Sequence, residues 1–149
     1  MYTIDEIMTT DVFTLYQSDN LFEARQLMEK EKIRHLPILN SADQFVGLIT
    51  NRDILAAAVS VLADMTEREK IDIESSIQIQ DIMSKHIFVA NENVEIMEAS
   101  QHLVDHKHGC LPVVNGTKNL VGIITETDFV RLAANLLEQM SLQEPLEID

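Results

Sequence analysis

The chain has 149 residues, a length that suits one domain with a substantial buried core. Its formal net charge of −14, with only 11 scattered Lys and Arg residues, opposes binding to a nucleic-acid backbone or to an anionic membrane surface. No apolar run approaches the ~20 residues that cross a bilayer, and the N-terminus lacks a signal-peptide pattern, so we expect a cytoplasmic protein.

The first predicted elements are a helical turn, a brief strand and a longer helix. Thr3 can cap the turn, with Glu6 completing a capping box three residues later. Residues 12–15 have the composition of a short strand. The longer helix is indicated by apolar residues that share one face, with Asn20 as its cap. These apolar residues are Leu21, Ala24 and Met28.

Two strands and a second helix are predicted next. The first strand, residues 36–40, contains Pro37, which a sheet accepts only at the start of a strand or at its edge. The second strand, residues 45–50, is almost continuously apolar, as expected of a strand covered on both faces. A helix then begins at Thr50, and Asp53 completes its capping box.

An internal repeat links the two halves of the chain. A shift of 75 residues places residues 4–58 on residues 79–133 without an insertion, and matches occur at both apolar and polar positions. Examples are Ile7/Ile82, Met8/Met83, Leu36/Leu111, Pro37/Pro112, Gly47/Gly122, Thr50/Thr125 and Asp53/Asp128. The chain therefore consists of two copies of one unit.

The second copy predicts the same elements in the same order. A strand is expected over residues 87–90, followed by a helix with its apolar stripe at Ile96, Ala99 and Leu103. Asn93 is the candidate cap of that helix, and Gly109 suits its end. Strands at residues 110–115 and 120–125 precede a helix that begins at Thr125.

The repeated order β-α-β-β-α predicts an α/β (α+β) fold in which two copies pack about a pseudo-twofold axis, because one copy can hardly bury its own sheet. We place the first repeat at residues 1–62 and the second at residues 77–140. Residues 63–76 are acidic and lack Gly and Pro, which indicates a helical connector. Residues 141–149 are expected to form a flexible tail.

The repeated Thr-x-x-Asp segment has two interpretations. Thr50 with Asp53, and Thr125 with Asp128, can form capping boxes and nothing more. Alternatively, the backbone N–H groups and the positive dipole end of a helix that starts at a strand end can hold a phosphate. The two interpretations use the same residues, so other features must distinguish them.

The doubled motifs resemble those of CBS domains, and the whole chain resembles a tandem CBS pair, or Bateman module. The features that carry the resemblance are EIM and DIM near the repeat starts, Leu-Pro in the predicted strands, and Gly followed by two aliphatic residues and Thr-x-x-Asp. The second half is most similar to stand-alone CBS pairs of the acetoin-utilisation type. The resemblance implies a regulatory module without catalytic activity or a catalytic cofactor.

By this resemblance, AMP, ADP, ATP or S-adenosylmethionine would bind in two clefts between the repeats. The Asp of Thr-x-x-Asp would hold the ribose hydroxyls, the Thr would approach the phosphate, and backbone beside the Leu-Pro strand would contact the adenine edge. Carried over to this chain, Thr50 and Asp53 would serve one cleft, and Thr125 and Asp128 the other. A carboxylate can accept hydrogen bonds from both ribose hydroxyls, which agrees with these roles.

Basic residues distinguish the first repeat from the second. Arg34, His35 and Arg52 belong to the first repeat, and their counterparts are Gly109, Cys110 and Thr127. We therefore predict one dominant phosphorylated nucleotide, with Asp53 on its ribose and a weaker cleft at Asp128. A solvated or ion-paired surface role is the alternative for Arg34 and Arg52.

Few features of the sequence indicate a metal site or a catalytic site. His102, His106 and His108 lie close together, but no Cys or carboxylate completes a tetrahedral set on that face, so no metal site is predicted. Cys110 is the only cysteine and is expected to be a core thiol. The chain lacks a P-loop, a nucleophile elbow and a GxGxxG motif, so we expect no catalysis.

Two functions are therefore open. The first is a regulatory module that binds an adenine nucleotide and signals its occupancy to an unknown partner protein. The second is a ligand-free CBS scaffold for dimerisation or protein interaction. In both cases we expect a homodimer, because the helices after Thr50 and Thr125 carry apolar residues on more than one face. These residues are Ile54, Leu55, Ala58, Val59, Leu62, Phe129, Val130, Leu132, Ala133, Leu136 and Leu137.

Overall fold

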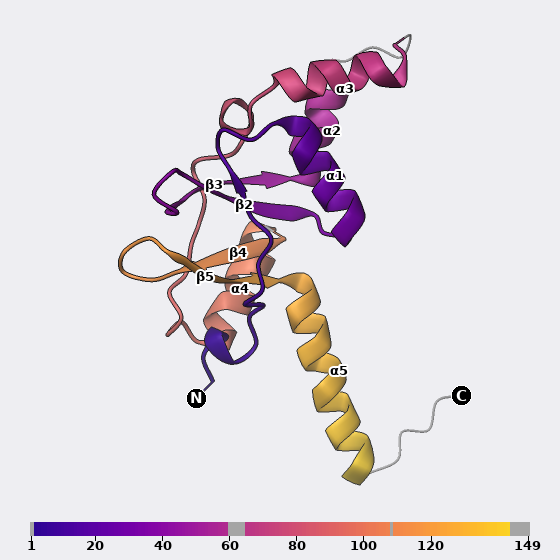
Figure 1. Cartoon of the computed structure of the whole chain (residues 1–149). Helices are drawn as coiled ribbons and strands as arrows, with labels where there is room; N and C mark the ends of the chain where they lie inside the picture. The colour runs from indigo at the N-terminus through magenta and orange to yellow at the C-terminus, as the bar shows by residue number, and fades with distance from the viewer. Residues whose placement is uncertain (1, 60–64, 108, 144–149) are drawn as a thin grey trace, which may run out of the picture. The chain divides into compact units, whose positions relative to one another are not determined.

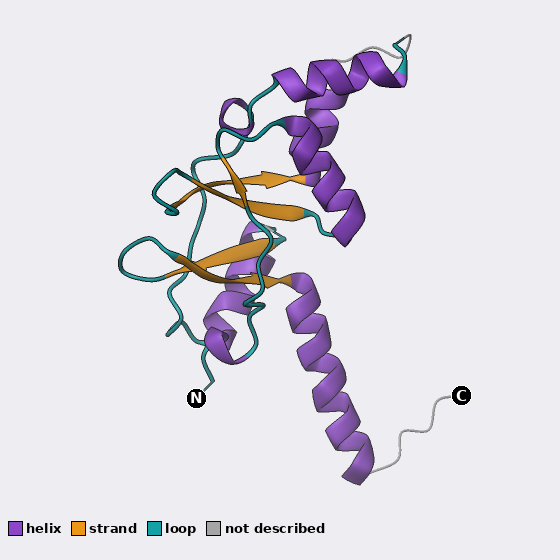
Figure 2. Ribbon diagram, in the orientation of Figure 1, coloured by secondary structure: helices purple, strands orange, loops and turns teal. Residues whose placement is uncertain are grey.

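The computed structural model describes residues 2–59, 65–107 and 109–143, and it combines strands with helices as expected of an α+β fold (Figures 1 and 2). No helix in these residues has the length and apolar character needed to cross a bilayer. The elements in chain order are η1 (Ile4–Glu6), β1 (Leu15–Tyr16), α1 (Leu21–Glu31), β2 (His35–Leu39), β3 (Phe45–Thr50), α2 (Asn51–Val59), α3 (Glu67–Ser76), η2 (Ile79–Asp81), α4 (Ile96–His106), β4 (Cys110–Val114), β5 (Leu120–Thr125) and α5 (Glu126–Gln143).

The chain forms two compact units, and the repeats exchange their leading segments between them. One unit contains the chain up to Asp11, Val89–Asn115 and the chain from Val121 onward. The other contains Val12–Phe88 and Gly116–Leu120. The N-terminal segment thus packs with the strands of the second repeat, while the segment that introduces the second repeat packs with the strands of the first.

The unit built on Val12–Phe88 contains a three-stranded sheet in the order β1-β2-β3. The two-residue strand β1 runs parallel to β2, and β2 pairs antiparallel with β3. Pro37 lies inside β2 and precedes Ile38 and Leu39, the residues that pair with β1. The proline therefore lies outside the short stretch that β1 pairs, which is how an internal strand accommodates a residue without an N–H group.

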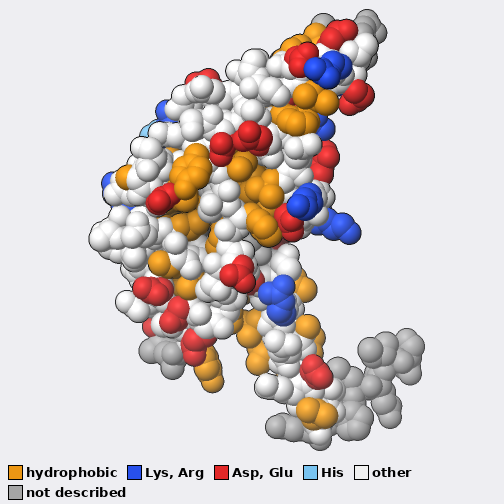
Figure 3. Space-filling model, viewed as in Figure 1, with side chains coloured by type: hydrophobic (Ala, Val, Ile, Leu, Met, Phe, Trp, Pro, Cys, Tyr) orange, Lys and Arg blue, Asp and Glu red, His pale blue; other side chains and the backbone are white. Residues whose placement is uncertain are grey.

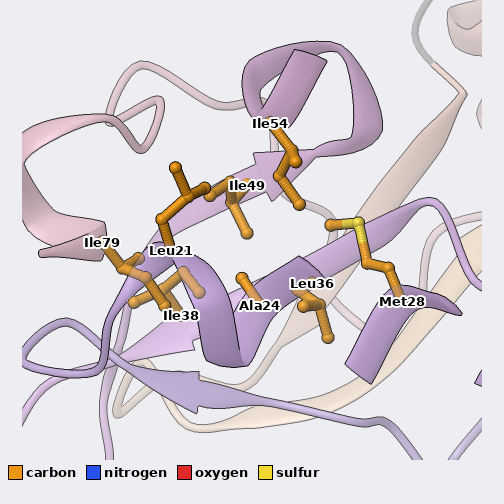
Figure 4. Close-up of a cluster of buried hydrophobic side chains, with 8 residues drawn as sticks. All are labelled: Leu21, Ala24, Met28, Leu36, Ile38, Ile49, Ile54 and Ile79. Carbon is orange, nitrogen blue, oxygen red and sulfur yellow. The ribbon is translucent and has the colours of Figure 1, made fainter. Parts of the chain in front are cut away.

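A cluster of buried apolar side chains joins α1 to this sheet (Figure 4). The predicted stripe of α1 is confirmed, because Leu21, Ala24 and Met28 are the buried residues of the helix. Ile79 enters the same cluster from η2, the leading segment of the second repeat. The other members of the cluster are Leu36, Ile38, Ile49 and Ile54.

The second unit has a related core with less regular strands. β4 and β5 form a two-stranded sheet, and Ala90 makes a parallel bridge to Val113 where the first repeat has β1. The strand predicted over residues 87–90 is thus reduced to a bridge. The core contains Ala99 and Leu103 from α4 and also Ile4 from η1. Its remaining buried members are Ala90, Leu111, Val113 and Ile124.

Two of the predicted helix boundaries in the second repeat are wrong. The cap of α4 is Glu95, which makes no side-chain capping bond, whereas Asn93 donates its N–H to Asn91 Oδ1 in the preceding turn. The helix ends at Lys107 in the left-handed conformation, with φ of 55°, rather than at Gly109. In the first repeat, the prediction for Asn20 is confirmed, because its side chain accepts the Glu23 N–H at 2.9 Å.

Helix α3 lies within the segment predicted as a connector, and an ion pair fastens it to α1. Arg25 Nε lies 2.7 Å from Glu74 Oε2, and Glu74 is only 5% exposed. The hydrogen bond to Glu74 raises the pKa of Arg25 above its usual value. At the C-terminus, α5 continues through Gln143 into the predicted tail, and residues 144–149 of that tail lie outside the described residues.

Each repeat contains a strand glycine that allows an exchanged segment to approach closely. A Cβ atom on Gly47 would lie 2.7 Å from Met83 Sδ and 2.9 Å from the Ser84 carbonyl oxygen. A Cβ atom on Gly122 would lie 2.5 Å from Met8 Sδ. The glycine in the repeated motif is therefore required by packing against the leading segment.

We expect Gly47→Ala to lower the free energy of unfolding by about 1–3 kcal/mol, because the new methyl group overlaps a backbone oxygen as well as a side chain. Gly116→Ala is the matched control, since a Cβ there meets nothing within 4 Å. Urea denaturation measures both changes. Equal stability of the two variants would contradict the packing requirement at Gly47.

Candidate functional site

The first Thr-x-x-Asp motif forms a capping box at the start of α2. The Thr50 N–H and Thr50 Oγ1 both donate to Asp53 Oδ2, at 2.8 and 3.0 Å. The Asp53 N–H donates to Thr50 Oγ1 at 3.3 Å. Among the residues that the structure describes, no donor reaches the second carboxylate oxygen, Asp53 Oδ1.

The second motif repeats the two bonds that the threonine donates at the start of α5, and its aspartate has further partners. The Thr125 N–H and Oγ1 donate to Asp128 Oδ2 at 2.8 and 3.3 Å. Asp128 Oδ1 accepts from Thr9 Oγ1 at 2.9 Å and from an Arg131 guanidinium nitrogen at 3.2 Å. Asp128 is 3% exposed.

The two aspartates therefore differ in the capacity that they have left for a ligand. A carboxylate offers roughly four acceptor positions, two on each oxygen. Four protein donors use those of Asp128, whereas the two bonds from Thr50 leave Asp53 Oδ1 open. Two open positions on one oxygen match a pair of neighbouring hydroxyl groups, such as those of a ribose.

The structure places the predicted basic residues of the first repeat beside this motif. The Asn51 N–H donates to the Arg34 carbonyl oxygen at 2.9 Å, and His35 pairs with Thr50 across β2 and β3. Arg34 and Arg52 are exposed, and the described chain offers neither of them an ion-pair partner. Two cations are thus available near the start of α2.

At the corresponding positions, the second repeat follows the same backbone path but lacks the charged side chains. The Glu126 N–H donates to the Gly109 carbonyl oxygen at 3.3 Å, as Asn51 does to Arg34. Cys110 is buried, and burial raises the pKa of its thiol to about 12, which confirms the prediction of a core thiol. Thr127 is exposed and uncharged. The start of α5 therefore lacks counterparts of Arg34 and Arg52, and the cation that it does have, Arg131, is paired with Asp128.

A groove of about 320 Å³ lies next to the first motif, where α1 and α2 meet. Arg34 and Asn51 belong to its lining, which combines charged with apolar side chains. Its other lining residues are Arg25, Met28, Glu29, Lys32, Ile33, Ile54 and Leu55. On the face shown in Figure 3, acidic and basic side chains are interspersed, and no extended basic patch gathers there.

The histidines of α4 form no candidate metal centre within the described residues. The rings of His102 and His106 stack, with centroids 4.2 Å apart. His106 Nδ1 also lies 3.1 Å from the His102 carbonyl oxygen. His108, the third histidine considered from the sequence, lies outside the described residues.

Sequence reasoning missed Thr9 and Arg131, which complete the environment of Asp128. Arg131 was detectable, because it follows Asp128 by three residues on a predicted helix, a spacing that brings opposite charges together. Thr9 carries no local signal, since it lies 119 residues from Asp128 and reaches it only through the exchanged N-terminal segment.

Comparison with known proteins gives consistent matches over both repeats. The family model for the CBS domain matches residues 4–60 and 79–135. Inosine-5'-monophosphate dehydrogenase of Methanocaldococcus jannaschii is 32% identical over 127 residues, which cover 85% of this chain and 23% of the dehydrogenase. The chain spans less than half the length of the first curated relatives that it matches.

Two solved structures resemble nearly the whole chain. A Vibrio cholerae protein described as an acetoin utilization protein (AcuB) is 33% identical with a TM-score of 0.81, over 95% of this chain and 98% of the other. CBSX2 of Arabidopsis thaliana, solved in complex with AMP, is 25% identical with a TM-score of 0.77, over 91% of this chain and 98% of the other.

Proposed function

The chain belongs to the CBS domain family, and we propose that it is a regulatory module that binds one adenine nucleotide through Thr50 and Asp53. The observation that carries the proposal is the open oxygen Asp53 Oδ1, held in place by a capping box that occupies only Oδ2. In this proposal the ribose hydroxyls donate to Oδ1, because an ionised carboxylate accepts hydrogen bonds and cannot donate them.

The surroundings of Asp53 support a phosphate at the same end of α2. The start of a helix carries a partial positive charge. Arg34 and Arg52 add exposed cations without ion-pair partners in the described chain. In a protein whose formal net charge is −14, two such cations beside one helix start favour an anionic ligand there.

The AMP complex of CBSX2 supports an adenine nucleotide as the ligand class, since that protein is similar over most of this chain. AMP, ADP, ATP and S-adenosylmethionine are therefore the ligands to test. We further propose that nucleotide occupancy is passed to a partner protein in the cytoplasm, and that the chain needs no catalytic cofactor.

A thermal-shift panel of these four ligands tests the proposal. Binding to the folded state alone stabilises it by RT ln(1 + [L]/Kd), which is about 2.7 kcal/mol at a hundredfold excess over Kd. We expect a clear rise in melting temperature with at least one ligand and a stoichiometry near one by calorimetry. If none of the four raises the melting temperature, the chain acts as a ligand-free scaffold instead.

We expect Arg52→Ala to weaken ATP binding by roughly tenfold and to leave adenosine binding nearly unchanged, because a charge-assisted bond to phosphate is lost only with the phosphorylated ligand. Arg68→Ala is the matched control, since it removes the same charge from α3, where Arg68 pairs with Asp72. Isothermal titration calorimetry compares the variants. Equal losses for ATP and adenosine would remove Arg52 from the phosphate site.

We also propose that the chain forms a homodimer through α5 together with α2. Beyond Ala133, α5 exposes apolar side chains along most of its length, including Leu136 at 51%, Leu137 at 52% and Met140 at 62%. A second copy of the chain would cover these side chains. Of the residues named for this interface in α2, Leu55 is 56% exposed. Leu62 and the side chains of Ala58 and Val59 lie outside the described residues.

We expect Leu136→Glu to convert the dimer into a monomer at micromolar concentration, because a carboxylate is costly to bury in an apolar interface. Analytical ultracentrifugation measures the change. Gln139→Glu is the control, since it adds the same charge to the same helix at a polar position. A parent chain that sediments as a monomer would refute the dimer.

A further inference from the structure

We propose that Arg131 closes the second Thr-x-x-Asp motif against adenine nucleotides by occupying the carboxylate oxygen that a ribose hydroxyl would need. The inference deepens the proposed function and rests on it, because it assigns the difference between the two motifs to one side chain. Charge near the phosphate was the sequence-based reason for unequal sites. Arg131 adds a separate reason that acts at the ribose.

The contacts of Asp128 carry the first step. Asp128 Oδ1 accepts from Arg131 at 3.2 Å and from Thr9 Oγ1 at 2.9 Å, while Thr125 uses Oδ2. Both oxygens are therefore engaged by the protein, and the Asp128 side chain is only 1% exposed. A ribose hydroxyl can reach this carboxylate only by displacing one of its present donors.

The first repeat contains an open version of the same motif. At the 75-residue shift, Arg131 corresponds to Ala56 and Thr9 corresponds to Ser84. Alanine has no donor, and the described residues include none that bonds to Asp53 Oδ1. The two motifs share the two bonds that the threonine donates to Oδ2, and they differ in the donors that reach Oδ1.

The exposure of Arg131 identifies it as the removable donor. Its side chain is 63% exposed, so the guanidinium covers the buried Asp128 carboxylate on the side that faces solvent. Thr9 belongs to the exchanged N-terminal segment and is backbone-paired to Ile123, which fixes its position. Removal of the Arg131 guanidinium therefore frees one acceptor position on Oδ1 without altering the capping box.

The test uses Arg131→Met, which keeps the length of the side chain and removes its donors. The probes are AMP and 2'-deoxy-AMP, which carry the same phosphate and differ in one ribose hydroxyl. In calorimetry we expect about one equivalent of AMP for the parent and a second equivalent for the variant. Affinity at the second motif should rise roughly tenfold or more. The new site should prefer AMP over 2'-deoxy-AMP, a preference that a purely structural role of Arg131 would not create.

The reciprocal variant places the closing side chain on the first motif. Ala56 is exposed, so the α2 surface has room for Ala56→Arg at the same spacing from Asp53 that Arg131 has from Asp128. We expect this change to weaken AMP at the first motif roughly tenfold or more. Ala56→Met is the control for bulk without donors and should bind AMP nearly as the parent does.

The outcomes separate this inference from the proposed function. If the parent binds one AMP and Arg131→Met binds one with the same affinity, the inference is overturned and the proposed function stands. If Arg131→Met binds AMP more weakly than the parent, Arg131 is a ligand contact and the inference is also overturned. Absence of AMP binding by the parent and by every variant would overturn both.

Discussion

Arg25→Met is expected to lower the free energy of unfolding by about 3–5 kcal/mol, because it leaves the Glu74 carboxylate buried without its partner. Arg25 Nε lies 2.7 Å from Glu74 Oε2, and the Glu74 side chain is 6% exposed. Methionine keeps most of the aliphatic stem, so the loss reports the missing charge more than the missing bulk. Urea denaturation should show a lower midpoint with an unchanged m-value.

The double variant Arg25→Met with Glu74→Leu is the control for this prediction. Replacing both members of a buried ion pair by apolar residues is often neutral, so most of the lost stability should return. The surface pair of Arg68 with Asp72 offers a second comparison, and Arg68→Met should change stability by less than about 1 kcal/mol. A similar small loss for Arg25→Met would show that Glu74 is solvated and that the ion pair does not fasten α3 to α1.

Asp53→Ala is expected to weaken binding of the adenine nucleotide by roughly a hundredfold or more, because two hydroxyl groups of the ribose lose a charged acceptor. Each hydrogen bond to a charged group contributes about 1.5–3 kcal/mol. Calorimetry with AMP measures the change. The same substitution also disturbs the capping box at Thr50, which costs about 0.5–2 kcal/mol of stability whether or not a ligand binds.

Asp128→Ala separates these two effects. It removes the equivalent Thr125 bonds and also the bonds from Thr9 and Arg131, so it should lower stability at least as much, yet it should leave the dominant nucleotide site intact. A loss of stability therefore does not identify the aspartate that binds the nucleotide, and only affinity does. If Asp53→Ala binds AMP as tightly as the parent, the motif is a cap and the proposed role of Asp53 in binding fails.

Features that depend on neighbouring residues were predicted well from the sequence. The stripe of Leu21, Ala24 and Met28 is buried as expected, because helical spacing alone brings these residues to one face. The helices that follow Thr50 and Thr125 begin where the capping boxes predicted, since those bonds close within three residues. The CBS family and the mixed α+β fold followed from the order of such local signals in two copies.

Some local predictions failed because two signals competed for the same turn. Asn93 is a residue type that often caps helices, yet its N–H donates to Asn91 Oδ1 in a turn. Glu95 is the cap of the helix instead. Gly109 suits a helix end, yet Lys107 accepts the left-handed conformation two residues earlier. Lys32 adopts the same conformation in the first repeat, with φ of 55°, so this helix end is a property of the repeated unit.

Thus the sequence by itself determined the repeat, the family and the positions of both Thr-x-x-Asp motifs, because these depend on spacing along the chain. Only the tertiary structure decided that the two motifs differ at the carboxylate. Thr9 reaches Asp128 from 119 residues away through the exchange of leading segments, whereas no described donor reaches Asp53 Oδ1. Local patterns carry no information on such long-range contacts, because packing between distant segments selects which donor meets which acceptor.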